Sequence, residues 1–140
     1  MLNFSGLRAW YAACISIGVS GCYFWLPLVE EQANMNPEIE FSSPELDGVF
    51  TLDSPTGSVA WVAVTDPDEE DTIEYLWTID GLGPQATATA FVNQNYQGSA
   101  ITLTPDPIYD GRTLTCMVYD SRGATARATW EIEVPEGQIQ

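Results

Sequence analysis

The chain has 140 residues with 20 acidic side chains, four arginines, no lysine and no histidine, which gives a formal net charge of −16. A polyanion of this kind is repelled by nucleic acids and by anionic lipid headgroups. The missing histidines and lysines remove the commonest general base and the amine of Schiff-base chemistry, so the composition argues against an enzyme.

Residues 1–21 have the layout of a secretory signal peptide. One positive charge, Arg8, precedes a mostly apolar stretch at residues 9–19. A transmembrane helix needs roughly 20 apolar residues, so this stretch is short for a membrane span. The motif Val19-Ser20-Gly21-Cys22 follows. It resembles the bacterial lipobox, in which an aliphatic residue and two small residues precede a cysteine.

The lipobox resemblance implies that Cys22 is acylated, that the preceding peptide bond is cut, and that the chain is a bacterial lipoprotein. Each buried methylene of an acyl chain contributes about 0.8 kcal/mol, so several chains would hold the protein firmly at a bilayer. Tyr23 follows the cysteine, and similarity to enterobacterial sorting then implies the outer membrane, on its periplasmic or surface side. An ordinary signal peptide or an uncleaved anchor is the alternative.

Residues 22–36 are expected to form the lipidated N-terminus and a tether. The aromatic cluster at residues 23–26 fits either the membrane interface, where aromatic rings are favoured, or packing on the domain or a partner.

Short runs rich in β-branched and aromatic residues, separated by Gly, Pro, Asp and Asn, begin at residue 37. This pattern predicts an all-β domain over residues 37–136, an antiparallel β-sandwich of about seven strands or more, and a tail at 137–140. The expected strands are residues 39–43, 48–52, 58–65, 72–79, 86–92, 99–104, 113–119 and 125–134.

Alternation assigns the inward faces of three strands. A one-residue slip of the last strand would bury its charges, so its register is well defined. The side chains expected to face the core are Ile73, Tyr75, Trp77, Ile79, Leu114, Cys116, Val118, Ala126, Ala128, Trp130, Ile132 and Val134.

Two motifs resemble those of bacterial immunoglobulin-like domains of the PKD and cadherin-like kind. Residues 64–68, VTDPD, followed by IEYLW at 73–77, are similar to one signature, and VYDSRG at 118–123 is similar to another. The resemblance implies an Ig-like sandwich. It departs from disulfide-bonded Ig domains, because the strand at 58–65 has no cysteine and Leu114 stands where a tyrosine is usual.

Cys116 is expected to be the one cysteine left in the folded domain, because Cys14 leaves with the signal peptide and Cys22 carries lipid. No disulfide within the domain is then available, and Cys116 is interpreted as a small buried hydrophobic residue.

Five carboxylates lie within residues 66–71, a density of oxygen donors that suits Ca²⁺. The Ig-like resemblance implies that this loop lies near the turn at 120–123, and cadherin-like modules bind Ca²⁺ at that end. The candidate ligands are Asp66, Asp68, Asp71 and Asp120. Asp side chains also cap turns, and turn-capping is the favoured interpretation of Asp66 and Asp120.

Exposed aromatic side chains are the other candidate contacts. Trp61, Tyr96 and Tyr109 are candidates for stacking on a sugar or contacting a partner, whereas Trp77 and Trp130 are expected in the core.

We therefore expect a non-catalytic, lipid-anchored module of the bacterial envelope that contacts another protein as an accessory or assembly factor. The alternative is a surface adhesion or carbohydrate-binding module, with Ca²⁺ as an optional cofactor of either. A glycosidase would need a carboxylate pair with one raised pKa, which solvated loop acids do not provide. Exposed apolar patches on one sheet would favour the protein partner, whereas an exposed aromatic row with polar rims would favour carbohydrate binding.

Overall fold

The computed structural model describes residues 33–68, 71–85, 87–92 and 96–137, which belong to a compact unit spanning Gln32–Gln140. These residues form nine strands and one short 3₁₀ helix, so the expected all-β fold is confirmed. The strands are β1 (Glu38–Ser43), β2 (Val49–Thr51), β3 (Ser58–Thr65), β4 (Glu74–Ile79), β5 (Gly83–Pro84), β6 (Thr89–Val92), β7 (Gln97–Leu103), β8 (Thr113–Tyr119) and β9 (Thr125–Glu133), and the helix η1 is Pro107–Tyr109.

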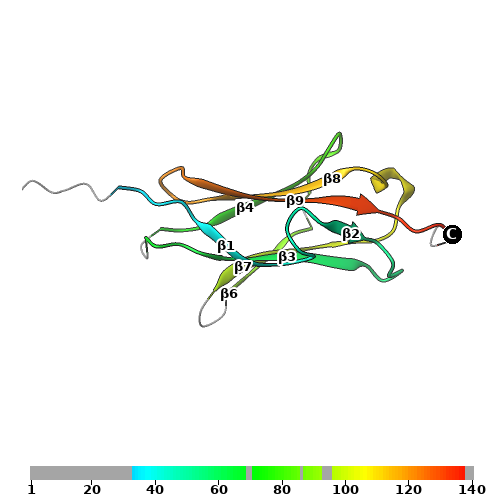
Figure 1. Ribbon diagram of the computed structural model, residues 1–140, viewed down its shortest axis with the longest axis horizontal. Helices are drawn as coiled ribbons and strands as arrows, with labels where there is room; N and C mark the ends of the chain where they lie inside the picture. The colour runs from blue at the N-terminus through cyan, green and yellow to red at the C-terminus, as the bar shows by residue number, and fades with distance from the viewer. Residues whose placement is uncertain (1–32, 69–70, 86, 93–95, 138–140) are drawn as a thin grey trace, which may run out of the picture. The chain divides into compact units, whose positions relative to one another are not determined.

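The strands form two facing sheets (Figure 1). One sheet has the order β1-β3-β7-β6 and the other has the order β2-β9-β8-β4-β5. Every described pairing is antiparallel except that of β2 with β9, which is parallel. In the nomenclature of Ig-like sandwiches, the first sheet corresponds to strands ABED and the second contains strands GFC. The second sheet has one additional short strand at each edge, β2 and β5.

The structure has more strands than the approximately seven expected, because the sheets are extended at their edges. After Ser43 the chain leaves β1 and continues as β2 in the opposite sheet. A turn makes this switch, in which the Gly48 backbone N–H donates to the Glu45 carbonyl at 3.1 Å. Residues 80–84, which lie between two of the expected strands, also contribute β5, which pairs with the end of β4.

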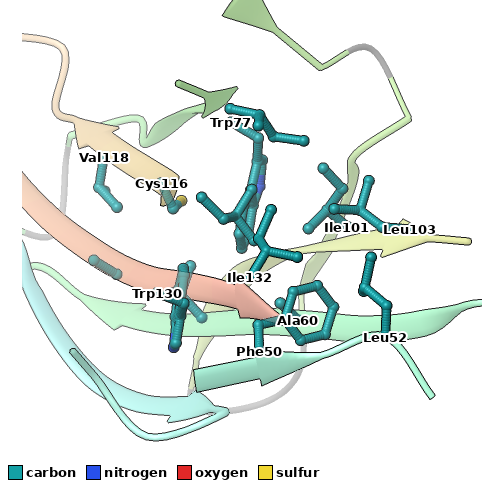
Figure 2. Close-up of a cluster of buried hydrophobic side chains, with 14 of the residues drawn as sticks. Phe50, Leu52, Ala60, Trp77, Ile101, Leu103, Cys116, Val118, Trp130 and Ile132 are labelled. Carbon is teal, nitrogen blue, oxygen red and sulfur yellow. The ribbon is translucent and has the colours of Figure 1, made fainter. Parts of the chain in front are cut away.

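The core lies between the sheets around two stacked indoles (Figure 2). The ring centroids of Trp77 and Trp130 are 5.7 Å apart and their planes differ by 14°. Both rings are buried, as are Leu114, Cys116 and Val118 from β8. The inward faces predicted for the strands at 72–79, 113–119 and 125–134 are therefore confirmed, with Ile73, Tyr75 and Ala126 partly buried at the margin.

The outer faces of the two sheets differ. The middle of the β4-β8-β9 face carries a row of paired threonines, Thr78, Thr115 and Thr129. The face of the β1-β3-β7-β6 sheet instead carries aromatic side chains, described below. Among the described residues, no helix has the length and apolar character needed to cross a membrane.

Candidate functional site

Three aspartates meet at one end of the sandwich, where the β3–β4 and β8–β9 connections lie. Asp66, Asp71 and Asp120 each present a carboxylate oxygen, and these oxygens all lie within 4.8 Å of one another. Asp68, the fourth predicted ligand, belongs to the same connection as Asp66 and is buried. The structure thus gathers the acidic residues of both motifs, although they are about 50 residues apart in the sequence.

Asp66 and Asp120 shape their own turns. The Asp68 backbone N–H donates to Asp66 Oδ1 at 2.8 Å. Asp120 Oδ1 accepts backbone N–H bonds from Arg122 at 2.9 Å and from Ala124 at 2.7 Å. These are Asx-type turns, in which a short acid side chain replaces a missing backbone acceptor. The turn-capping role given by the sequence is therefore present at both positions.

The segment that precedes β1 is fastened to the same end. The Asn34 side-chain amide donates to Asp120 Oδ2 at 2.9 Å, and the Met35 backbone N–H donates to Asp68 Oδ2 at 2.8 Å. The cluster therefore joins three stretches of chain: the entry to the domain and two loops.

Arg122 supplies a cation inside the cluster. Its guanidinium contacts Asp68 Oδ2 at 2.5 Å and Asp71 Oδ2 at 2.9 Å. The Ser121 hydroxyl donates to Asp71 Oδ1 at 2.5 Å. The hydrogen bond to Asp71 raises the pKa of Arg122, so this guanidinium stays charged. The sequence did not indicate this role for Arg122.

Negative charge remains in excess among the described residues at this end, since four carboxylates face one guanidinium. Desolvation pushes the pKa of Asp120 upward, but hydrogen bonds from Asn34 and from the turn's backbone outweigh it and hold that pKa below its usual value. Asp66 Oδ2 is buried and has no hydrogen-bond partner. An unpartnered carboxylate oxygen on a residue that lies close to the carboxylates of Asp71 and Asp120 fits a hard cation such as Ca²⁺. A lowered pKa is the opposite of what a glycosidase general acid needs.

The predicted aromatic contacts do not form one platform. Trp61 lies on the outer face of the β1-β3-β7-β6 sheet, half-buried and paired with Ser43 and Ala100. Tyr96 directly precedes β7 and packs edge-on against Phe41, with ring centroids 5.2 Å apart. Tyr109 lies in η1 and packs against the buried core, so it does not join Trp61 and Tyr96.

A cross-strand row on this outer face was missed by the sequence analysis. Phe41 pairs with Ala63, Ala63 with Gly98, and Gly98 with Phe91, so the row crosses all four strands. Ala63 is only 4% exposed although it points outward. A Cβ on Gly98 would meet the Phe91 ring at 2.4 Å, so this ring lies directly over the glycine. The signal for the row was the placement of small residues between two aromatics, and it was hidden because the expected strands stop at residue 92 and resume at residue 99, which leaves Gly98 out.

Of Cys116 and Cys22, only Cys116 lies within the described residues. Cys116 has a free thiol, is fully buried, and burial raises its pKa to about 12, so it is unsuited to act as a nucleophile. Cys22 and the predicted tether up to residue 32 lie outside the described residues.

No family model matches the sequence, and no curated protein matches it either. The fold is similar to that of solved immunoglobulin-like domains. The Rst D1-D2 structure has a TM-score of 0.52 and 14% identity, covering 73% of this chain and 49% of that one. A titin Z1Z2 chimera has a TM-score of 0.49 and 12% identity over 74% of this chain and 97% of its own. The Ig1-2 module of Drosophila DLAR has a TM-score of 0.47 and 18% identity, covering 74% of this chain and 50% of that one. At this identity the similarity identifies an Ig-like fold.

Proposed function

We propose that the chain is a lipid-anchored module of the bacterial envelope that binds another protein through the outer face of the β1-β3-β7-β6 sheet. The observation that carries the proposal is the aromatic row on that face, where Phe41 and Phe91 flank Ala63 and Gly98. Phe41 is 50% exposed and Val59, on the same face, is 49% exposed. Contiguous exposed apolar side chains on one face mark interaction sites in soluble domains. The opposite face also exposes Val49 and Leu76, but they lie on β2 and β4, with β8 and β9 and their threonines between them.

The predicted acylation of Cys22 supports an envelope location. A module held at a bilayer meets its neighbours at high effective concentration, so a modest docking face is sufficient for stable contact. The carbohydrate-binding alternative would use Trp61 and Tyr96 on the same face. It is less well supported because Tyr109 packs against the core instead of extending a sugar-stacking platform.

Site-specific photocrosslinking in cells tests the proposal. A photoreactive residue replaces Trp61, near the middle of the aromatic face, or Thr115, in the middle of the opposite sheet. A defined protein adduct is expected from position 61 and not from position 115. The Cys22→Ser variant should leave the membrane fraction and lose the adduct. Equal adducts from both faces, or none from either, would contradict a docking role for this sheet.

A second candidate function is Ca²⁺ binding at the aspartate cluster. The specific observation in its favour is Asp66 Oδ2, a buried carboxylate oxygen without a partner whose neighbours include Asp71 and Asp120. The ion would rigidify the two loops and the entry to the domain, so either form of the binding module could be Ca²⁺-dependent. Extracellular Ca²⁺ modules commonly bind with Kd of about 10⁻⁴ to 10⁻³ M.

Thermal unfolding in calcium and in chelator tests this second function. At ten times Kd the ion would stabilise the folded state by about 1.4 kcal/mol, a rise in Tm of about 5 °C or more. The Asp66→Asn variant keeps an acceptor for the Asp68 backbone N–H but loses the anionic oxygen, so its Tm should no longer respond. Glu131→Gln, exposed on β9, is the matched control and should respond like the unchanged chain. Identical melting curves with and without calcium would end the idea.

A further inference from the structure

Strand β1 has an open edge. In the order β1-β3-β7-β6 it pairs only with β3 among the described strands. It has six residues, whereas the other edge strands β2, β5 and β6 have three, two and four. An open strand edge presents unpaired backbone donors and acceptors that an extended segment can use.

A groove lies beside the second half of β1. Its lining consists of Glu40, Phe41, Ser42, Glu45 and Leu46, and it has a volume of about 480 Å³. Phe41 and Leu46 are 50% and 44% exposed, so the groove has two apolar contact points beside the open edge. A register shift between Ile39 and Phe41 restricts regular pairing, so an added segment would pair along the short stretch from Phe41 to Ser43.

The far wall of the groove is held rigidly. The Asp47 backbone N–H donates to the Thr129 carbonyl at 3.0 Å, and the Thr129 hydroxyl donates to Asp47 Oδ1 at 2.6 Å. The Trp130 indole N–H donates to the Pro44 carbonyl at 3.0 Å. The turn that carries Leu46 is thus fixed to β9, and a preformed groove loses little entropy when it is filled.

The charged side chains along the β1 edge and its groove are all acidic. Glu38 and Glu40 lie on β1 and Glu45 on the adjoining turn, and all three are exposed. The described arginines lie elsewhere: Arg112 donates to the Asp80 and Ile108 carbonyls, Arg122 lies in the aspartate cluster, and Arg127 is on β9. A second copy of this edge would bring glutamates against glutamates, so charge disfavours self-pairing and favours a cationic occupant.

We propose that β1 accepts a short, basic, extended segment of the partner protein as an added strand. Its backbone pairs along the β1 edge, its apolar side chains contact Phe41 and Leu46, and its lysines or arginines lie against Glu40 and Glu45. This inference rests on the proposed function in so far as the occupant is a protein, and it adds the binding edge and the chemistry of the segment.

Binding of a defined peptide to the full chain in detergent solution tests the proposal. The probe is a dye-labelled peptide of about eight residues in which lysine alternates with valine, flanked by proline to prevent self-assembly. A peptide with glutamate in place of lysine is the control. The lysine peptide should bind at least about tenfold more tightly, weaken at high salt, and shift backbone amide resonances between Glu38 and Leu46.

Two charge-reversed variants locate the interaction. Glu40→Lys with Glu45→Lys should weaken binding about tenfold, whereas Glu131→Lys with Glu133→Lys on β9 makes the same change in net charge and should alter it less than about twofold. Equal losses in both variants, no preference for lysine, or amide shifts confined to another strand would each overturn the proposal. An adduct from position 61 that persists in the Glu40/Glu45 variant would overturn the β1 site alone and leave the proposed function intact.

Discussion

Removing the Ser99 hydroxyl should destabilise the domain, because that hydroxyl connects the two sheets. Ser99 on β7 accepts a hydrogen bond from the Trp77 indole N–H of β4 at 3.0 Å, and the two residues are 2% and 1% exposed. In Ser99→Ala the indole N–H stays buried without that acceptor. A buried donor left unsatisfied costs about 1–3 kcal/mol, so we expect a loss of about 2 kcal/mol.

Urea unfolding followed by tryptophan fluorescence and circular dichroism measures this loss. With a slope of roughly 1–3 kcal/mol per molar urea, the midpoint should fall by about 1 M while the slope is unchanged. Ser58→Ala, on the same sheet, is the control: Ser58 is half-buried and its hydroxyl makes only a surface hydrogen bond to Asp53, so the loss should stay within about 0.5 kcal/mol.

A double-mutant cycle isolates the pair. In a Trp77→Phe background the indole donor is already absent and Ser99→Ala removes only the 3.4 Å hydrogen bond to the Thr89 carbonyl, so it should cost about 1 kcal/mol or less. If Ser99→Ala leaves the midpoint unchanged, or costs as much with phenylalanine as with tryptophan, the hydrogen bond is not what stabilises this contact.

Three further perturbations test other parts of the fold. Gly98→Ala places a Cβ 2.3 Å from the Val62 carbonyl oxygen and should destabilise by about 2 kcal/mol or more in urea unfolding, and a neutral result would contradict the close approach. Asp120, whose pKa is lowered, contributes stability above about pH 4 that is lost as pH falls through its folded pKa, so Asp120→Asn should flatten the acid limb of a stability–pH curve. Cys116, with a pKa of about 12, should resist a thiol reagent at pH 8 until the chain unfolds, and rapid labelling of the native chain would refute its burial. Because the thiol ionises more readily in the unfolded chain, the free energy of unfolding should fall as pH rises above about 9.

The strands at 58–65 and 113–119 were predicted with the bounds that the structure has, because runs rich in β-branched and apolar residues lie there between strong turn formers. The region around Gly98 was not. Glycine and asparagine are typical of loops, so the expected strands left out residues 93–98, yet Gln97 and Gly98 belong to β7. The backbone there is strand because it pairs with β3 on one side and with β6 on the other, and these pairings depend on tertiary structure.

The candidate site was predicted in composition but not in its contacts. The proximity of Asp66 and Asp120 followed from the resemblance to Ig-like domains, in which those two loops lie at one end. The ion pairs of Arg122 and the hydrogen bond from Asn34 join segments far apart in the chain, and no local pattern specifies them. The aromatic row likewise depends on the register of four strands, which sequence alternation alone does not fix.

The parallel pairing of β2 with β9 determines how the domain responds to tension. The bonds from Val49 to Thr51 join the first part of the sandwich to its last strand, with partners from Glu131 to Glu133. A pull on the chain before β1 and after β9 would load these bonds lengthwise and together, instead of peeling them apart singly. Once β1 has been pulled from β3, a protein tethered at one end and gripped at the other would therefore resist extension at this short junction.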